Sequence, residues 1–431
     1  MKLDLLIRDA SVVLTCDDSD RVLTDVSIGI RDGCIAHIGH SDPAPHADRV
    51  LQAQGHLVLP GLINLHTHLA MTLLRGVAEN VDLQGFLALV WAEEARLMDE
   101  SGVELGTRLG SLEALLGGTT TALDMYFHPH AAHRGAVALG LRHVTGPLFF
   151  DFPGPDGMDW SARMAYARNW PRLLANMGGP EVPLALMPHS PLTVGPNRLS
   201  EVAQLADQFD GMVHTHASEN RAENSQTLEK FGARPIALLQ TAGLLRPGTV
   251  IAHGVHLDDA DIAALTAKAS SLAHCPGSNL KLASGAADVV KYRNAGLRVG
   301  IGTDGCASSN DLDMFAAMRL AANLSRLVRD DPAAISAAHI IKMATQYGAD
   351  ALGMGDRIGS VEVGKQADLV LLDLAAPHLV PLRDPATAVV FSAGRTDVRH
   401  VLVAGEVVIA DRVPTRIDMA DLLAEAREVI R

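Results

Sequence analysis

The chain has 431 residues, with 50 acidic and 36 basic side chains and a formal net charge of −14. Hydrophobic residues make up 48% and charged residues 20%, which is ordinary for a folded chain and argues against extensive disorder. The negative charge repels phosphate backbones, so we expect no nucleic-acid partner. No apolar run approaches the ~20 residues that cross a bilayer, and charged residues at positions 4, 8 and 9 interrupt any signal peptide. We therefore expect no membrane partner. The four cysteines are scattered and form no CxxC pair, which favours a cytoplasmic location.

Short strand patterns occupy both ends of the chain. Residues 25–30 and 34–39 flank an Asp-Gly turn typical of a hairpin, and residues 367–374 and 400–410 repeat this pattern near the C-terminus. Neither end is long enough to bury a good core alone. We therefore predict one small β-sandwich domain built from residues 1–56 and 359–431, with a helix at its C-terminal end.

The middle of the chain, residues 57–358, alternates buried strand patterns with helical ones. The eight strand candidates are 61–66, 119–127, 142–150, 182–189, 211–216, 248–254, 270–275 and 297–304. Helical periodicity lies between them, for example at 199–209 and 259–269. This alternation predicts an α/β fold, a (β/α)₈ TIM-like barrel. An open doubly wound sheet is the second choice, but the Gly-rich phosphate loop that usually marks it is absent from the sequence.

Metal-binding residue types recur at the ends of the predicted strands. His66 and His68 are two residues apart, so their side chains point to the same side of a strand. His216 and Asp304 end two further strands, and the carboxyl ends of barrel strands converge on one face. Three imidazoles and a carboxylate predict a divalent metal site. Zinc suits this set best, and ligand type alone leaves iron or nickel open.

Other histidines receive different interpretations. His214 is in register with His216 but deeper, which favours a packed histidine that supports a ligand. His128, His130 and His133 lie in a segment that we interpret as a solvated loop.

Five segments together resemble the amidohydrolase superfamily. They are PGLINLHTHLAMTLLRG (60–76), HTHASEN (214–220), AHGVHL (252–257), HCPGSNLKL (274–282) and GIGTDGCASSNDLDM (300–314). More narrowly, they resemble the branch that contains the S-adenosylhomocysteine/methylthioadenosine deaminases and the triazine chlorohydrolases. The resemblance covers essentially the whole chain, and its motifs specify the superfamily better than the substrate.

Within this resemblance, the distribution of lysines indicates the number of metal ions. Two-metal members bridge their ions with a carboxylated lysine from the fourth strand, whereas no lysine lies between Lys2 and Lys230 here. The resemblance therefore implies a single ion, and it places His189 near the end of that strand.

The resemblance also implies roles for three catalytic residues. Glu219, three residues beyond His216, would carry a proton to a ring nitrogen, as a non-ligand glutamate does in nucleobase deaminases. Asp304 would bind the metal and also accept the proton of the attacking water. His253 would hydrogen-bond that water.

Substrate contacts follow from the same comparison. Glu94 would bind ribose hydroxyls, because a carboxylate accepts two hydrogen bonds from a cis-diol. Trp91 would lie beside the purine or sugar, His189 would contact a purine nitrogen, and Ser308 would line the pocket. A solvent-exposed position on a helix, without a role in binding, would explain Glu94 almost as well.

The chain departs from the family pattern at two places. Leu192 replaces an aromatic residue that is more common there, and the loop after the third strand lacks an arginine that some members place near the homocysteine carboxylate. Arg163 is the first arginine after this loop. S-adenosylhomocysteine is therefore a less favoured substrate than a smaller nucleoside.

We predict a metal-dependent hydrolase acting on C–N bonds, which deaminates methylthioadenosine, adenosine or S-adenosylhomocysteine. The alternatives are an aminohydrolase of a triazine, pterin or oxidised guanine and, less favoured, a hydrolytic dechlorinase. A catalytically inactive scaffold is the third class, but such relatives usually lose ligands. The sequence leaves a homo-oligomer open.

Overall fold

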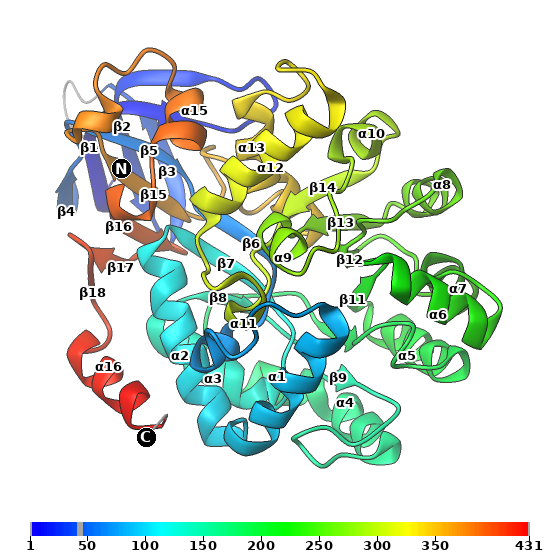
Figure 1. Cartoon of the computed structure of the whole chain (residues 1–431). Helices are drawn as coiled ribbons and strands as arrows, with labels where there is room; N and C mark the ends of the chain where they lie inside the picture. The colour runs from blue at the N-terminus through cyan, green and yellow to red at the C-terminus, as the bar shows by residue number, and fades with distance from the viewer. Residues whose placement is uncertain (1, 41–45, 430–431) are drawn as a thin grey trace.

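Strands from both ends of the chain join in one sheet in the computed structural model, which describes residues 2–40 and 46–429 (Figure 1). This nine-stranded sheet has the order β18-β17-β16-β15-β5-β1-β2-β3, and β4 also pairs with β1. Its strands are β1 (Leu3–Leu14), β2 (Val22–Arg31), β3 (Cys34–Gly39), β4 (Ala47–Gln52), β5 (His56–Pro60), β15 (Leu369–Asp373), β16 (Val398–Val403), β17 (Glu406–Ala410) and β18 (Val413–Pro414).

The predicted hairpin near the N-terminus is present. β2 and β3 are antiparallel with Arg31 opposite Cys34, and the two turn residues Asp32 and Gly33 both have positive φ, 52° and 75°. Asp-Gly is favoured there because a type I′ turn needs positive φ at both positions. The pairing of β5 with β15 joins the two chain ends, as expected. A separate β-sandwich is not confirmed.

Parallel strands occupy all eight predicted positions in the middle of the chain. They are β6 (Leu62–Thr67), β7 (Thr119–Asp124), β8 (Arg142–Val144), β9 (Leu148–Phe149), β10 (Ala185–Pro188), β11 (Met212–Ala217), β12 (Thr249–His253), β13 (Ser271–His274) and β14 (Arg298–Ile301). The predicted third strand is split, because β8 pairs with β7 while β9 pairs with β10. The hydrogen-bonded ladders thus form two parallel sheets, β6-β7-β8 and β14-β13-β12-β11-β10-β9.

Helices connect these strands and surround them (Figure 1). The longer ones are α1 (Leu83–Leu97), α2 (Glu100–Leu116), α3 (Pro129–Leu139), α4 (Trp160–Ala175), α5 (Pro196–Phe209), α6 (Arg221–Phe231), α8 (Asp259–Ala267), α12 (Met314–Arg329) and α16 (Met419–Glu428). The shorter ones are η1 (Leu69–Leu74), α7 (Pro235–Thr241), α9 (Pro276–Lys281), α10 (Val289–Asn294), α11 (Cys306–Ser309), α13 (Ala337–Met343), α14 (Gln346–Ala351), η2 (Pro377–Leu379), α15 (Pro385–Thr387), η3 (Ala388–Ser392) and η4 (Arg395–Asp397). No helix in the described ranges is long and apolar enough to span a membrane.

The segment around His128 corrects one prediction. It begins α3 and is not a loop, because Pro129 occupies the first helical turn, where its missing N–H costs nothing. His133 is buried and its Nδ1 lies 3.3 Å from Nδ1 of His143, so it is not a solvated histidine.

Candidate active site and metal centre

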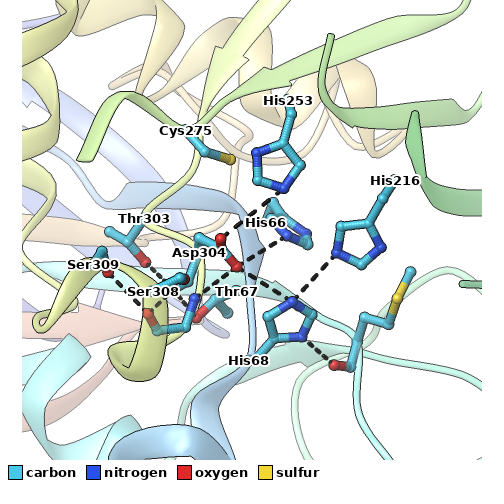
Figure 2. Close-up of polar contacts among 12 residues, drawn as sticks. His66, Thr67, His68, His216, His253, Cys275, Thr303, Asp304, Ser308 and Ser309 are labelled. Atoms are coloured by element: carbon cyan, nitrogen blue, oxygen red, sulfur yellow. Dashed lines mark hydrogen bonds and ion pairs between the residues drawn. The ribbon is translucent and has the colours of Figure 1, made fainter. Parts of the chain in front are cut away.

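The four predicted metal ligands lie together at the carboxyl ends of the parallel strands (Figure 2). Nε2 of His66 and Nε2 of His68 are each 3.3 Å from Oδ1 of Asp304, and Nε2 of His216 is 3.4 Å from Nε2 of His68. All four side chains are buried. The ligand atoms fall into two overlapping groups, His66–His68–His216 and His66–His253–Asp304. The four residues that the sequence proposes as ligands therefore lie close to one another in the structure.

Hydrogen bonds on the far side of each ring aim Nε2 at this point. Nδ1 of His68 donates to the carbonyl of Met125 at 2.6 Å, and Nδ1 of His216 donates to the carbonyl of His189 at 2.8 Å. Because a carbonyl can only accept, both rings carry a proton on Nδ1, and in the neutral form of each ring the Nε2 lone pair faces this point.

His66 also carries its proton on Nδ1, and the acceptor for this proton is His214. Nδ1 of His214 donates to the carbonyl of Val250 at 2.9 Å, so its Nε2 accepts from Nδ1 of His66 at 2.8 Å. This relay agrees with the supporting role predicted for His214. Burial lowers the pKa of His214 to about 3 and that of His66 well below its usual value, so both rings are neutral.

These residues fit a divalent cation. Nε2 of His66 is buried and has no hydrogen-bond partner, which is costly for a polar atom unless a ligand satisfies it. Burial favours a neutral Asp304, but the imidazoles of His66 and His68, each 3.3 Å from its Oδ1, outweigh burial and hold the pKa of this carboxyl well below its usual range. Neutral imidazoles with one ionised carboxylate are the donor set that zinc prefers.

Close backbone packing supports the metal ligands. A Cβ on Gly302, at the end of β14, would lie 3.0 Å from the backbone nitrogen and 2.9 Å from the carbonyl oxygen of His66. Only glycine lets these two strand ends approach so closely, and the N–H of Asp304 donates to the carbonyl of His66 at 3.0 Å. The geometry of Asp304 therefore depends on the close approach between the end of β14 and the end of β6.

Glu219 and His253 lie beside the four ligands. Nε2 of His253 is 3.8 Å from Oε2 of Glu219 and 4.0 Å from Oδ2 of Asp304, and its Nδ1 is 3.0 Å from Oδ1 of Asn279. Burial raises the pKa of Glu219, which suits a group that must both accept and release a proton. Both residues thus lie next to the proposed metal ligands.

A cavity of about 920 Å³, including its open mouth, joins this centre to α1. The predicted substrate residues Glu94, Trp91 and His189 all line it. His189 stacks on Phe150 with ring centroids 4.4 Å apart, and Nδ1 of His189 lies 2.9 Å from Oγ1 of Thr193. Burial lowers the pKa of His189 to about 3, so this ring enters the cavity uncharged.

Glu94 is buried, and the surface interpretation of this residue is wrong. Its side chain is 2% exposed because it lies on the cavity side of α1, and the hydroxyl of Tyr126 donates to its Oε1 at 2.7 Å. Burial raises the pKa of Glu94 to about 7 although the hydrogen bond from Tyr126 opposes the rise. Burying a carboxylate among apolar side chains costs free energy, so such a residue indicates a polar partner or a functional site.

Ser308 does not reach the cavity. It is buried on α11, and its hydroxyl donates to the carbonyl of Gly305 at 3.0 Å instead of facing the residues that line the site. The expectation that Ser308 lines the pocket is therefore corrected.

Sequence reasoning missed two residues of the cavity wall, Tyr126 and Glu223. Oε2 of Glu223 accepts from the backbone N–H of Glu219 at 2.7 Å, which holds the turn that carries Glu219. The signal for Glu223 was its position, one helical turn beyond Glu219 and three residues after the N-cap Asn220. Tyr126 could have been found as a polar aromatic residue close to the carboxyl end of the predicted strand 119–127.

The amidohydrolase family pattern matches residues 57–408. The chain belongs to the amidohydrolase family. It is 38% identical to a 5-methylthioadenosine/S-adenosylhomocysteine deaminase of Syntrophobacter fumaroxidans, over 99% of this chain and 98% of the relative. It is 41% identical to the protein of the same name from Natronomonas pharaonis, over 88% and 87% of the two chains.

Solved structures of this family include zinc proteins that resemble the chain closely. An adenosine deaminase from Xanthomonas campestris with bound zinc has a TM-score of 0.95 and 37% identity, over 100% of this chain and 98% of that one. An atrazine chlorohydrolase from Arthrobacter aurescens, complexed with zinc, has a TM-score of 0.91 and 26% identity, over 99% and 100%. The histidine-rich centre of this amidohydrolase is thus a metal site of the zinc-binding kind.

Proposed function

We propose that this amidohydrolase removes the exocyclic amine of an adenine-type nucleoside, which is methylthioadenosine, adenosine or S-adenosylhomocysteine, and releases ammonia. The observation that carries the proposal is a single cavity that exposes a buried carboxylate, Glu94, together with Glu219, His253 and Asp304. The names of the relatives support the same substrate class.

We assign the cation to His66, His68, His216 and Asp304, as one divalent ion. When bound, it supplies a Lewis acid that lowers the pKa of water from 15.7 toward ~7. The absence of lysine between Lys2 and Lys230 supports one ion.

The protein residues then divide the proton transfers. Oδ2 of Asp304 accepts the proton of the attacking water, which Nε2 of His253 orients by a hydrogen bond. Asp304 then gives this proton to the departing amine, which leaves as ammonia. Glu219 delivers a proton to the purine ring nitrogen next to the reacting carbon, which makes the ring electrophilic. The raised pKa of Glu219 supports this role because it favours the protonated form that donates to the ring.

The remaining cavity residues hold the nucleoside. Glu94 accepts hydrogen bonds from the two ribose hydroxyls, with Tyr126 fixing its carboxylate, and Trp91 covers the sugar. His189 contacts a purine nitrogen. These contacts orient the reacting carbon and exclude water from the remainder of the cavity.

We also propose an arrangement of the domains. The two parallel sheets are parts of one (β/α)₈ barrel over residues 57–358, and residues 1–56 and 359–431 form a second, small β domain. The N–H of Asp304, which donates to the carbonyl of His66 at 3.0 Å, supports closure between β14 and β6. Four free cysteines support a cytoplasmic location.

Ammonia release from a panel of substrates tests the function. The panel contains methylthioadenosine, adenosine, S-adenosylhomocysteine, free adenine and atrazine, each assayed with the native protein, Glu94→Ala and Glu94→Gln. We expect nucleosides to be preferred and Glu94→Ala to lower their kcat/KM on the order of 100-fold, because charged hydrogen bonds to the ribose are lost. Unchanged nucleoside kcat/KM in Glu94→Ala would contradict recognition of the ribose.

A further inference from the structure

We propose that the cavity selects adenine nucleosides whose 5′ substituent is short, apolar and uncharged, such as a methylthio group, and discriminates against a zwitterionic amino-acid tail such as homocysteine. This inference rests on the proposed function. The relatives are named for both methylthioadenosine and S-adenosylhomocysteine, and the inference separates these two substrates.

One face of α1 forms an apolar wall beside Glu94. Leu83, Leu87, Val90 and Trp91 all line the cavity, and they precede Glu94 by eleven, seven, four and three residues. This spacing places them on the same helical face as Glu94. A ribose held by Glu94 therefore has its 5′ carbon beside an apolar surface.

Aromatic and aliphatic side chains from other segments complete this wall. Phe127, Leu148, Phe150 and Leu192 line the same cavity, and the rings of Phe127 and Phe150 stack with centroids 5.7 Å apart. A thioether methyl group gains from burial against such a surface.

The charges that line the cavity offer no partner for a carboxylate. The acidic residues there are Glu94, Glu219, Glu223 and Asp304, and the remaining titratable side chains are histidines and Tyr126. Across the described residues, no lysine or arginine side chain lines this cavity. A carboxylate that enters it must therefore lose water without gaining a cation.

The arginine that follows the third strand is already used in the fold. Arg163 forms a two-pronged ion pair with Asp156, at 2.7 and 2.8 Å, and also donates to the carbonyl of Leu148 at 3.1 Å. Its side chain is 1% exposed. The guanidinium of Arg163 is therefore occupied by Asp156 and by the backbone, and it is not free to bind a carboxylate in the cavity.

Two further cations, Arg198 on α5 and Lys230 on α6, are bound to other groups. Arg198 pairs with Asp151 at 3.0 Å and lies over the ring of Trp160. Nζ of Lys230 donates to the backbone carbonyl of Leu192 at 3.3 Å, outside the residues that line the cavity. Lys230 is exposed and Arg198 is half-buried, and each is bound to another group, so neither is a preformed partner for the tail.

A comparison of three nucleosides separates charge from length. Methylthioadenosine, 5′-butylthioadenosine and S-adenosylhomocysteine are assayed for ammonia release by the zinc-loaded protein, because the butyl chain has the length of homocysteine without its charges. We expect kcat/KM for S-adenosylhomocysteine to be lower than for the butylthio compound by on the order of 30-fold or more. Equal values, or a higher value for S-adenosylhomocysteine, overturn the proposal. If none of the three releases ammonia, the proposed function itself fails and the selectivity fails with it.

Leu192 offers a variant that should reverse the preference. Leu192→Arg places a guanidinium in the cavity wall, and Leu192→Met is the matched control of similar volume without charge. We expect Leu192→Arg to raise the ratio of S-adenosylhomocysteine to butylthioadenosine kcat/KM about tenfold or more, while Leu192→Met leaves it unchanged. Lys230→Met should also leave the ratio unchanged. A tenfold fall in Lys230→Met would show that this lysine already binds the tail, which overturns the proposal.

Discussion

Single hydrogen bonds decide which nitrogen of each histidine faces the metal centre. His66 depends on His214, which is itself oriented by the carbonyl of Val250. The HxH and HxxE spacings predict the ligands, but they contain no information on these acceptors, since Val250 and Met125 belong to other segments of the chain. Residue types were therefore predictable from sequence, whereas the proton positions required the structure.

Replacing His214 tests this relay. His214→Phe keeps the ring volume but removes the acceptor for Nδ1 of His66, so we expect zinc affinity to fall 10–100-fold. Competition with a zinc-binding dye measures the affinity. His400→Phe, at a buried histidine in β16 of the terminal sheet, is the control and should retain the native affinity. Equal loss in both variants would indicate a general effect on folding.

Glu94 predicts a pH dependence of substrate binding. Burial raises its pKa to about 7, so the carboxylate is protonated below this pH and ionised above it. Only the ionised form accepts from both ribose hydroxyls, and KM for adenosine should therefore rise as the pH falls through about 7. A 2′,3′-dideoxyadenosine control lacks both hydroxyls and should show a flat KM over the same range. A parallel rise for both nucleosides would assign the effect to another group.

At the scale of elements, the turn between β11 and α6 determines the position of Glu219. Ser218 has a φ of 55°, in the left-handed region, and Glu223 at the third position of α6 accepts from the N–H of Glu219. The sequence places Glu219 at the correct distance from His216, but the bend that turns its carboxyl toward His253 is a property of the folded turn.

Variants of Glu223 test the contribution of this turn. Glu223→Gln keeps an acceptor oxygen for the N–H of Glu219, whereas Glu223→Ala removes it. We expect kcat to fall about 10–100-fold in the alanine variant and less than about threefold in the glutamine variant, with KM and zinc content unchanged in both. Loss of zinc in either variant would show that Glu223 supports the metal ligands instead of Glu219.

The strand pattern was the most predictable part of the fold, because buried parallel strands give nearly continuous apolar runs. The predicted third strand was the exception. Pro147 cannot donate a ladder hydrogen bond, and Gly146 brings its backbone against Ala185, so the chain divides into β8 and β9 at this point. An apolar run alone does not reveal such a break.

At the scale of the whole molecule, the two ends of the chain pair through β5 and β15. β6, the strand that carries His66, follows β5 directly. Gly61, between β5 and β6, donates its N–H to the carbonyl of Asp368 at 2.8 Å. The sequence predicted that the ends combine, because neither could bury a core alone. The strand order of the resulting sheet depends on pairing between residues more than 300 positions apart, which local patterns do not encode.

The central claim is that the four ligand residues hold one cation on which deamination depends. The most direct measurement is methylthioadenosine deamination by the native protein after chelation and during titration with zinc. We expect activity to disappear on chelation and to return in full at one equivalent of zinc per chain. Activity that persists in the metal-free protein, or that requires two equivalents, would contradict it.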